Sequence, residues 1–383
     1  MAKLGEVCDF YAGTGFPNEY QGRVAGKYPF YKVGDISKNV LEGNRELKIC
    51  ANYVDEEVVQ KLKGSILPPK TIVFAKIGEA LKLNRRAITS CECLVDNNVM
   101  GVKAQNGRLN DEYLFYWLQN LNLSDYSEST TVPSVKKSRL QNIEINVSPL
   151  EEQEKVASTL NKLSSLILAR KKQLSKLDEL VKARFVEMFG ERSSIRPQKL
   201  KEVTRRVKVG FVGTCEKYYT DNTGVPMLRT TNITSHGIDL KDLKYVTRTF
   251  HEKNLKSRVH KGDLLIARHG SNGQANVYCG DEAQCLNAII IEPDHNITNP
   301  IFLENLINSR SVKRQIEKEL VGSTQHVLNT TTLANVEVKI PAIKEQQVFA
   351  AFVERVDQQK QTVQQSLEKL ELMKKALMQE YFG

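Results

Sequence analysis

A repeated long helix is the feature that most constrains this fold. The 383-residue chain contains two stretches with the same pattern, 148–190 and 341–383, separated by an offset of 193 residues. A globular stretch precedes each of them, so we predict two copies of one unit, a globular domain followed by a helix. The offset aligns Glu152-Gln153 with Glu345-Gln346 and Phe189-Gly190 with Phe382-Gly383.

The globular stretches also correspond, but more loosely. Residues 28–36 (YPFYKVGDI) match 225–233 (VPMLRTTNI), and 140–145 (LQNIEI) match 333–338 (LANVEV). Helices that kept their pattern are expected to pack against something common to both copies, whereas diverged domains are expected to read different ligands. We predict a first globular domain at 1–147, a helix at 148–190, a second domain at 191–340 and a second helix at 341–383.

The helices show the pattern of a coiled coil. The first begins Ser148-Pro149-Leu150-Glu151, which predicts Ser as N-cap and Pro at the first helical position. Apolar residues then recur at about two positions in seven, the width of a helix-pair seam. The seam comprises Leu160, Leu163, Ile167, Leu174 and Leu177 in the first helix, and Val353, Val356, Leu367 and Leu370 in the second.

An antiparallel coiled coil is the simplest pairing, because the chain must return through a globular domain between the two helices. About 39 residues at about 1.5 Å each give a rod of roughly 58 Å, which could act as a ruler. The second helix lacks a Ser N-cap and carries Lys360 within its stripe. We therefore expect it to be the less regular of the two.

Both globular domains mix short strands with a helix. Apolar runs at 30–33, 71–75, 99–102 and 143–147 predict strands in the first domain, and 112–121 predicts a helix. The second domain repeats this order, with strands at 263–267, 288–291 and 336–340 and a helix at 300–308. The fold class predicted is α+β, with two such domains in tandem.

Polar and basic tracts recur at corresponding places in both domains. Arg, Lys, Asn and Gln can read base edges in the major groove, and Ser, Thr and glycine-bearing loops suit phosphates. The candidate DNA-binding residues are Lys32, Lys38, Lys76, Arg85, Arg86, Thr130, Thr131, Ser134, Lys136, Lys137 and Arg139 in the first domain, and Arg229, Thr230, Asn232, Arg268, His269, Ser271, Asn272, Gln274, Thr324, Gln325 and His326 in the second.

The positive charge lies mostly on the globular domains. The net charge is +10, of which the first domain carries +2, the second +6 and the two helices together +2. An acidic partner such as double-stranded DNA is expected on the domains, with more salt-sensitive phosphate contact from the second. The nearly neutral helices are expected to bind protein.

Several classes of protein are disfavoured by the sequence. No apolar run approaches the roughly 20 residues needed to cross a bilayer, so a cytoplasmic protein with no membrane partner is expected. Seven cysteines without paired spacing indicate idle thiols in a reducing compartment. Histidines at metal-ligand spacing, a phosphate-binding loop and the motifs of adenine methyltransferases are also lacking, which predicts no metal and no catalytic site.

One alternative function remains open from the residues alone. Asp35, Glu46 and Lys48 imitate the acidic pair and lysine of a Mg²⁺-dependent DNA endonuclease. Asn232 stands in the second domain where the first has Asp35, so the pattern is not duplicated.

The chain resembles the specificity (S) subunit of type I restriction-modification enzymes over essentially its whole length. The resemblance rests on the duplicated Pro-x-x-Glu-Gln-type helix start, on the heptad stripe ending in Phe-Gly, and on Thr-Val-Pro-Ser-Val at 131–135. The sequence departs from the family pattern at 148–150, where SPL replaces a double proline, and at 324–327, where Thr-Gln-His-Val replaces Thr-Val-Pro-Ser.

The resemblance implies a subunit without catalytic activity that reads DNA for a larger complex. Each domain would recognise one half of a bipartite site, and the helices would set the gap and dock two modification subunits that methylate adenine. Restriction subunits would translocate and cleave DNA. No cofactor is expected on this chain, whereas S-adenosylmethionine, ATP and Mg²⁺ are expected on the partner subunits.

Overall fold

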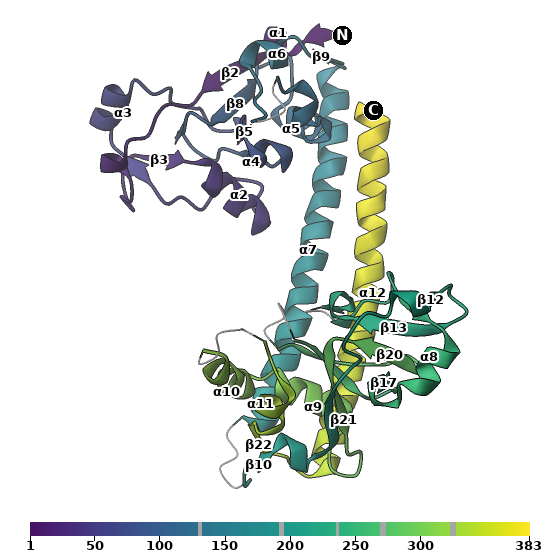
Figure 1. Cartoon of the computed structure of the whole chain (residues 1–383). Coiled ribbons are helices and arrows are strands. Elements are labelled where there is room, and N and C mark those ends of the chain that lie inside the picture. Colours follow the sequence, from purple (N-terminus) through teal and green to yellow (C-terminus); the bar gives the residue numbers. More distant parts are fainter. Residues whose placement is uncertain (129–131, 191–194, 235–236, 269–272, 322–326) are drawn as a thin grey trace. The chain divides into compact units, whose positions relative to one another are not determined.

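The computed structural model describes residues 1–128, 132–190, 195–234, 237–268, 273–321 and 327–383. It contains two long helices, α7 (Leu150–Phe189) and α12 (Ile343–Phe382), which are labelled in Figure 1. The chain divides into two compact units. Unit 1 comprises Met1–Lys172 and Gln364–Gly383, and unit 2 comprises Gln173–Val363, so each unit takes part of both long helices.

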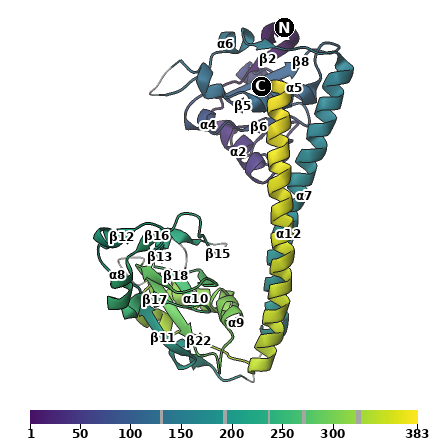
Figure 2. The same cartoon turned by 90° about the vertical axis from the view of Figure 1, so that its right-hand side faces the viewer.

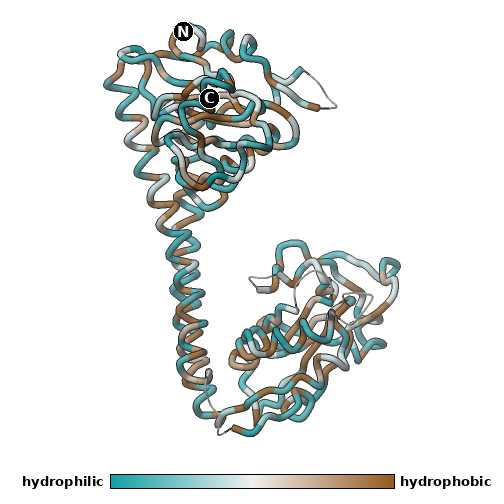
Figure 3. The backbone as a smooth tube through the Cα atoms, turned by 90° about the vertical axis from the view of Figure 1, so that its left-hand side faces the viewer, coloured by the Kyte–Doolittle hydropathy of each residue, from teal (hydrophilic) through white to brown (hydrophobic). Residues whose placement is uncertain are grey.

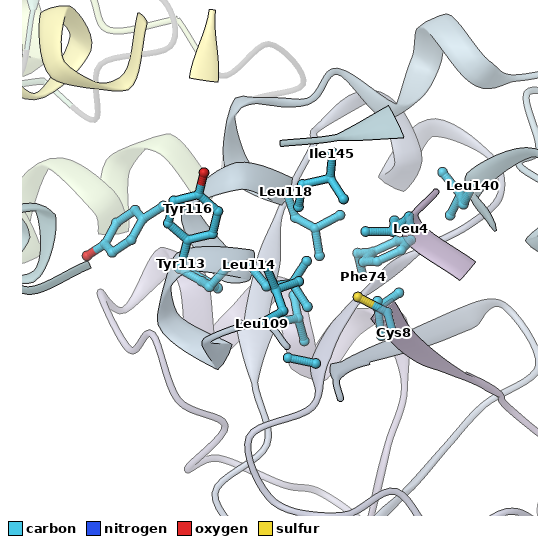
Figure 4. Close-up of a cluster of buried hydrophobic side chains, with 14 of the residues drawn as sticks. Leu4, Cys8, Phe74, Leu109, Tyr113, Leu114, Tyr116, Leu118, Leu140 and Ile145 are labelled. Atoms are coloured by element: carbon cyan, nitrogen blue, oxygen red, sulfur yellow. The ribbon is translucent and has the colours of Figure 1, made fainter. Parts of the chain in front are cut away.

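A four-stranded antiparallel sheet forms the centre of unit 1, in the order β2-β8-β5-β6. Helix α5 (Asp111–Asn120) packs against this sheet, and Figure 4 shows Leu114 of α5, Phe74 of the sheet and Leu4 in one buried cluster. The same cluster includes residues of both α7 and α12, so the long helices complete this core. The strands are β2 (Cys8–Ala12), β8 (Val99–Ala104), β5 (Ile72–Ala75) and β6 (Arg86–Ile88).

A smaller three-stranded sheet, β4-β3-β7, and the pair β1-β9 complete the strands of unit 1. The pair β1-β9 joins the start of the chain to the strand that precedes α7. The remaining elements are β1 (Ala2–Lys3), β3 (Tyr28–Tyr31), β4 (Tyr53–Val54), β7 (Leu94–Val95), β9 (Glu144–Ile145), α1 (Leu4–Val7), α2 (Val33–Leu41), α3 (Glu56–Leu62), α4 (Glu79–Lys82), α6 (Lys137–Gln141), η1 (Asn18–Tyr20) and η2 (Leu123–Tyr126).

Unit 2 repeats this plan with additions. Its four-stranded sheet, β11-β21-β18-β19, has the order and antiparallel pairing of the first, and β10-β22 corresponds to β1-β9. Helix α9 takes the place of α5. The strands are β10 (Gln198–Lys199), β11 (Thr204–Val209), β18 (Leu264–Ala267), β19 (Ala275–Val277), β21 (Ala288–Pro293) and β22 (Glu337–Val338), and the helices are α9 (Pro300–Ile307), α10 (Arg310–Val321) and α11 (Thr330–Ala334).

The second sheet of unit 2 has five strands in the order β12-β16-β13-β20-β17, with β13 and β20 parallel as β3 and β7 are in unit 1. The hairpin β14-β15 has no counterpart among the described strands of unit 1. These elements are β12 (Tyr219–Thr220), β13 (Val225–Arg229), β14 (Ile233–Thr234), β15 (Gly237–Ile238), β16 (Lys244–Val246), β17 (Arg258–Val259), β20 (Ala283–Leu286), α8 (Arg248–Lys253), η3 (Leu200–Glu202), η4 (Glu216–Tyr218), η5 (Thr230–Asn232) and η6 (Leu255–Ser257).

The predicted antiparallel pairing of the long helices is confirmed. In unit 1 the early part of α7 packs with the end of α12, and Lys171 forms an ion pair with Glu371 at 2.8 Å. In unit 2 the late part of α7 packs with the start of α12. The two helices lie side by side in Figure 1, and in the turned view of Figure 2 α12 passes in front of α7.

The predicted seam residues are all buried or half-buried along the two helices. Figure 3 shows apolar and polar segments alternating along the helices, as a two-in-seven stripe requires. On α12, Met373 is exposed, with half of its surface accessible, whereas Lys374 is half-buried. Leu160, Leu163, Val353, Val356 and Leu367 are buried, and Ile167, Leu174, Leu177 and Leu370 are half-buried.

The second helix is as regular as the first, which corrects our expectation. Both have 40 residues without a break. Lys360 is accommodated because its Nζ lies 2.8 Å from the carboxylate of Asp178 on α7 and 3.3 Å from Asp357. An opposite charge across the seam offsets the cost of placing an ammonium group there.

The start of α7 also differs from our prediction. The helix begins at Leu150, and the backbone amides of Glu152 and Gln153 donate to the carbonyl of Pro149. The side chain of Gln153 donates to the Ser148 carbonyl at 2.7 Å, so the buried glutamine organises this turn.

Candidate nucleic-acid interface

Two candidate residues occupy the same place in the two units. Lys76 directly follows β5, and Arg268 directly follows β18. The carbonyl of Lys76 accepts from the amide of Val135 at 2.9 Å, and that of Arg268 accepts from Leu328 at 3.2 Å. Each unit thus ties the loop before α6 or α11 to the end of a central strand, next to a basic side chain.

The loop of unit 1 presents several exposed cations. Lys136, Lys137 and Arg139 are exposed, and Ser134 is half-buried. Glu128 partly neutralises this group, because its carboxylate lies 2.6 Å from Lys136 and 3.4 Å from Arg139. The hydrogen bond from Lys136 lowers the pKa of the Glu128 carboxyl, which keeps it ionised.

Three further candidates of unit 1 lie on other elements. Lys32 lies between β3 and α2, at the N-cap position of α2, and its Nζ donates to Gln21 at 3.0 Å. Lys38 is exposed on α2, and Arg85 is half-buried between α4 and β6. The cation of Lys38 is therefore the most accessible of the three.

Arg86 is a correction to the predicted site. Its side chain is buried, and its guanidinium donates to the carbonyls of Asn84 and Leu121, both at 2.7 Å. These bonds join β6 to the end of α5 and leave the group inaccessible to DNA. Adjacent arginines look alike in the sequence, but Arg86 belongs to β6, all of whose residues are buried, whereas Arg85 lies just before that strand.

Asn232 is a second correction, because it supports a turn. Its carbonyl oxygen accepts from the Arg229 amide at 3.0 Å, and its amide donates to the carbonyls of Asp239 and Asp242. Asp35 does the same in unit 1, accepting from the Lys32 amide at 2.8 Å. The Asp-to-Asn difference between the copies thus preserves a capping oxygen.

The other candidates of unit 2 are partly engaged or lie outside the described residues. The guanidinium of Arg229 forms an ion pair with Asp242 at 3.0 Å, while Thr230, Arg268 and Gln274 are half-buried. Thr130 and Thr131 of unit 1, and His269, Ser271, Asn272, Thr324, Gln325 and His326 of unit 2, lie outside the described residues.

The nuclease alternative finds little support in the geometry. Asp35 is engaged as a cap, whereas Glu46 and Lys48 are exposed. Among the described residues, no group of three or more His, Cys, Asp and Glu side chains is placed to hold a metal ion.

None of the helices formed by the described residues is both long and apolar enough to cross a membrane.

Sequence reasoning missed the roles of Gln153 and Gln346, which are both fully buried. The side-chain oxygen of each glutamine accepts a hydrogen bond of 2.8 Å from the backbone amide of an asparagine. These are Asn110, before α5, and Asn299, before α9. The Gln153 amide donates to Arg108 and Ser148, and the Gln346 amide donates to Ile297 and Pro341. The duplicated Glu-Gln pair was the available signal, since a polar residue retained in both copies suggests a shared task.

Arg45 forms a second unpredicted link between the first globular domain and α7. Its guanidinium lies 4.5 Å from the Phe115 ring and contacts Glu112 and Asn161. A groove of about 820 Å³ adjoins these groups, between the start of α5 and the outer face of α7. Leu166, which lines that groove, exposes nearly half of its surface.

Comparisons with known proteins agree with this architecture. The family profile of the type I restriction modification DNA specificity domain matches residues 1–179 and 208–372. The chain belongs to this family. It carries the domain twice, as the internal repeat predicted.

Relatives and a solved structure support this membership. The MjaVIII specificity subunit of Methanocaldococcus jannaschii is 25% identical, covering 97% of this chain and 96% of its own. The EcoBI specificity subunit of Escherichia coli is 20% identical, covering 92% and 78%. The crystal structure of an S subunit from M. genitalium has a TM-score of 0.60 at 14% identity, covering 100% and 95%, which shows the shared fold.

Proposed function

We propose that this chain is the non-catalytic DNA-reading subunit of a type I restriction-modification complex. The observation that carries the proposal is the duplicated specificity domain, with Lys76 and Arg268 at equivalent strand ends beside equivalent loops. Each domain would read one half of a bipartite site in double-stranded DNA. Exposed cations contact phosphates in such interfaces, and polar side chains contact base edges.

The long helices would set the distance between half-sites and dock two modification subunits. Their outer faces carry apolar side chains that the seam does not need, including Leu166 and Leu372 in unit 1 and Val186 and Val348 in unit 2. These exposed side chains would form part of a docking surface for a partner protein in each unit. One such surface in each unit suits one partner per unit.

The chemistry is assigned to the partners. Modification subunits would bind S-adenosylmethionine and methylate adenine, and restriction subunits would use ATP and Mg²⁺ to translocate and cleave DNA. The proposal therefore places no cofactor on this chain and places the complex in the cytoplasm.

Reconstitution with the modification subunits tests the proposal. Methyl transfer to DNA should require this chain and should occur at one asymmetric, bipartite sequence, mapped by methylation sequencing. Native mass spectrometry should find two modification subunits for each copy of the chain. Methylation without a bipartite motif would refute the proposal.

A control separates the reader from a nuclease. The purified chain incubated with DNA and Mg²⁺ should leave the DNA intact. Cleavage that disappears in Glu46→Ala would favour the endonuclease built on Asp35, Glu46 and Lys48.

A further inference from the structure

Each recognition domain meets its long helix through a pair of amides that survives in both copies. Gln153 and Asn110 in unit 1 correspond to Gln346 and Asn299 in unit 2. Both asparagines cap a helix, since their side-chain oxygens accept from the amides of the second and third residues that follow. We call each pair with its hydrogen bonds an amide clamp.

The clamp ties three separate pieces of backbone together. In unit 1 the Gln153 side chain accepts from the Asn110 amide and donates to the carbonyls of Arg108, at 3.3 Å, and Ser148, at 2.7 Å. In unit 2 the Gln346 amide donates to Ile297 at 2.9 Å and Pro341 at 2.8 Å. The start of α5 or α9 is thereby joined to the first turn of the long helix and to the segment that leads into that helix.

The surroundings of the clamp differ between the copies. Glu112, which contacts Arg45, has Ile301 as its counterpart, and Phe115 has Glu304. Both glutamines nevertheless remain fully buried with the same pattern of bonds. Because a buried amide that loses its partners is costly, retention of this geometry indicates a shared requirement.

Apolar packing alone leaves the angle between domain and helix loosely specified, because it is not directional. Hydrogen bonds have a preferred direction and restrict that angle. A protein that reads two half-sites needs this angle to be restricted. One turn of B-DNA takes only about 10 base pairs, so each added base pair rotates one half-site relative to the other by roughly 36°.

We infer that Gln153 and Gln346 are positioning residues that fix each recognition domain on its helix and so confine the protein to one gap between half-sites. The inference rests on the proposed function. Both glutamines are fully buried, so they touch no DNA and act through the backbone of α5 and α9.

The test uses the reconstituted complex and a series of duplexes whose half-sites are separated by the native gap or by one base pair more or less. Gln153→Met and Gln346→Met keep the side-chain volume but remove the clamp. Gln347→Met is the matched control, because Gln347 is exposed on the same turn of α12.

Each clamp variant should lower the preference for the native gap by roughly fivefold, the worth of about one net hydrogen bond. The double variant should lower it by the product of the two single effects, because the clamps share no contacts. The control should keep the wild-type preference, and all variants should recognise the same bases.

The outcomes distinguish failure of the inference from failure of the proposed function. If the wild-type complex methylates no bipartite site, the proposed function is wrong. If it does, but the clamp variants lose methylation equally at every gap or behave like Gln347→Met, the inference is wrong. Gln153→Asn and Gln346→Asn serve as milder variants, and failure of both kinds to assemble would assign the glutamines to folding and overturn the inference.

Discussion

Glu304 is a residue whose protonation is coupled to the stability of unit 2. It lies on α9, and its carboxylate accepts from the Val277 amide at 3.2 Å. Burial raises the pKa of Glu304 to about 7, with Asp357 adding to the increase and Lys360 opposing it. Because the folded pKa exceeds that of the unfolded chain, the unfolded state loses its proton first as pH rises.

We predict that Glu304→Gln removes a pH-dependent loss of stability in unit 2. The wild-type free energy of unfolding should fall between about pH 4.5 and pH 7, by on the order of 3 kcal/mol, and then remain level with respect to this group. Glutamine keeps the acceptor for Val277 without a charge, so the variant should be more stable at pH 8 and nearly unchanged at pH 4.5.

Urea unfolding followed by circular dichroism measures this difference. Fluorescence of Trp117, the single tryptophan of the chain, reports on unit 1 and should not change. Glu319→Gln on the exposed face of α10 is the control. An equal pH dependence in wild type and Glu304→Gln would contradict the assignment.

For single residues, the sequence indicated the residue type but not where the side chain points. It identified Lys136, Lys137 and Arg139 as candidate DNA-binding cations, and the structure shows all three exposed. It could not distinguish Arg85 from buried Arg86, or recognise that Asp35 and Asn232 cap equivalent turns. Those distinctions depend on which carbonyl or amide lies nearby, and the tertiary fold decides that.

The long helices are the elements that the sequence predicted best. Their stripe extends over many turns, so the period is clear even though Lys360 interrupts it. Short elements were predicted less well. Residue 33 was assigned to a strand, but Val33 begins α2, where the Asp35 cap turns the chain. The amphipathic helix α10 was not expected, because a single short helix gives a weak periodic signal.

Lengthening both long helices tests their role as a ruler. We predict that one heptad inserted after Lys171 in α7 and another before Glu371 in α12 keeps the seam in register, because these residues pair. The insertion adds about 10 Å of helix, equivalent to at most about three base pairs. The gap in the methylated motif should lengthen accordingly.

Methylation sequencing of cells carrying the lengthened chain and its partners provides the measurement. A heptad inserted in α7 alone is the control, since it shifts one seam against the other and should impair assembly. An unchanged gap in the doubly lengthened protein would refute the ruler.

For the whole molecule, the repeat predicted two similar units. It did not predict that each unit would include part of both long helices. A repeat suggests that each domain packs on the helix that follows it. The structure divides both helices between the units, because antiparallel pairing brings the end of each copy's helix to the other copy's domain.

Exchange of one domain should alter one half of the recognised sequence. We predict that replacing residues 191–338 with the equivalent segment of another family member changes one half-site and leaves the other half and the gap unchanged. Methylation sequencing of the hybrid checks this outcome. A change in both halves would mean that the domains do not read independently.

The reciprocal sharing of helices also bears on the order in which the chain can fold during synthesis. Phe189 at the end of α7 packs on Phe302 in unit 2, whereas Phe382 at the end of α12 packs on Tyr113 in unit 1. Domains usually fold in order from the N-terminus as the ribosome makes them. Here the N-terminal unit obtains the last part of its core only when residues 364–383 have been made, so a ribosome that stalls before them leaves the first-made domain incomplete.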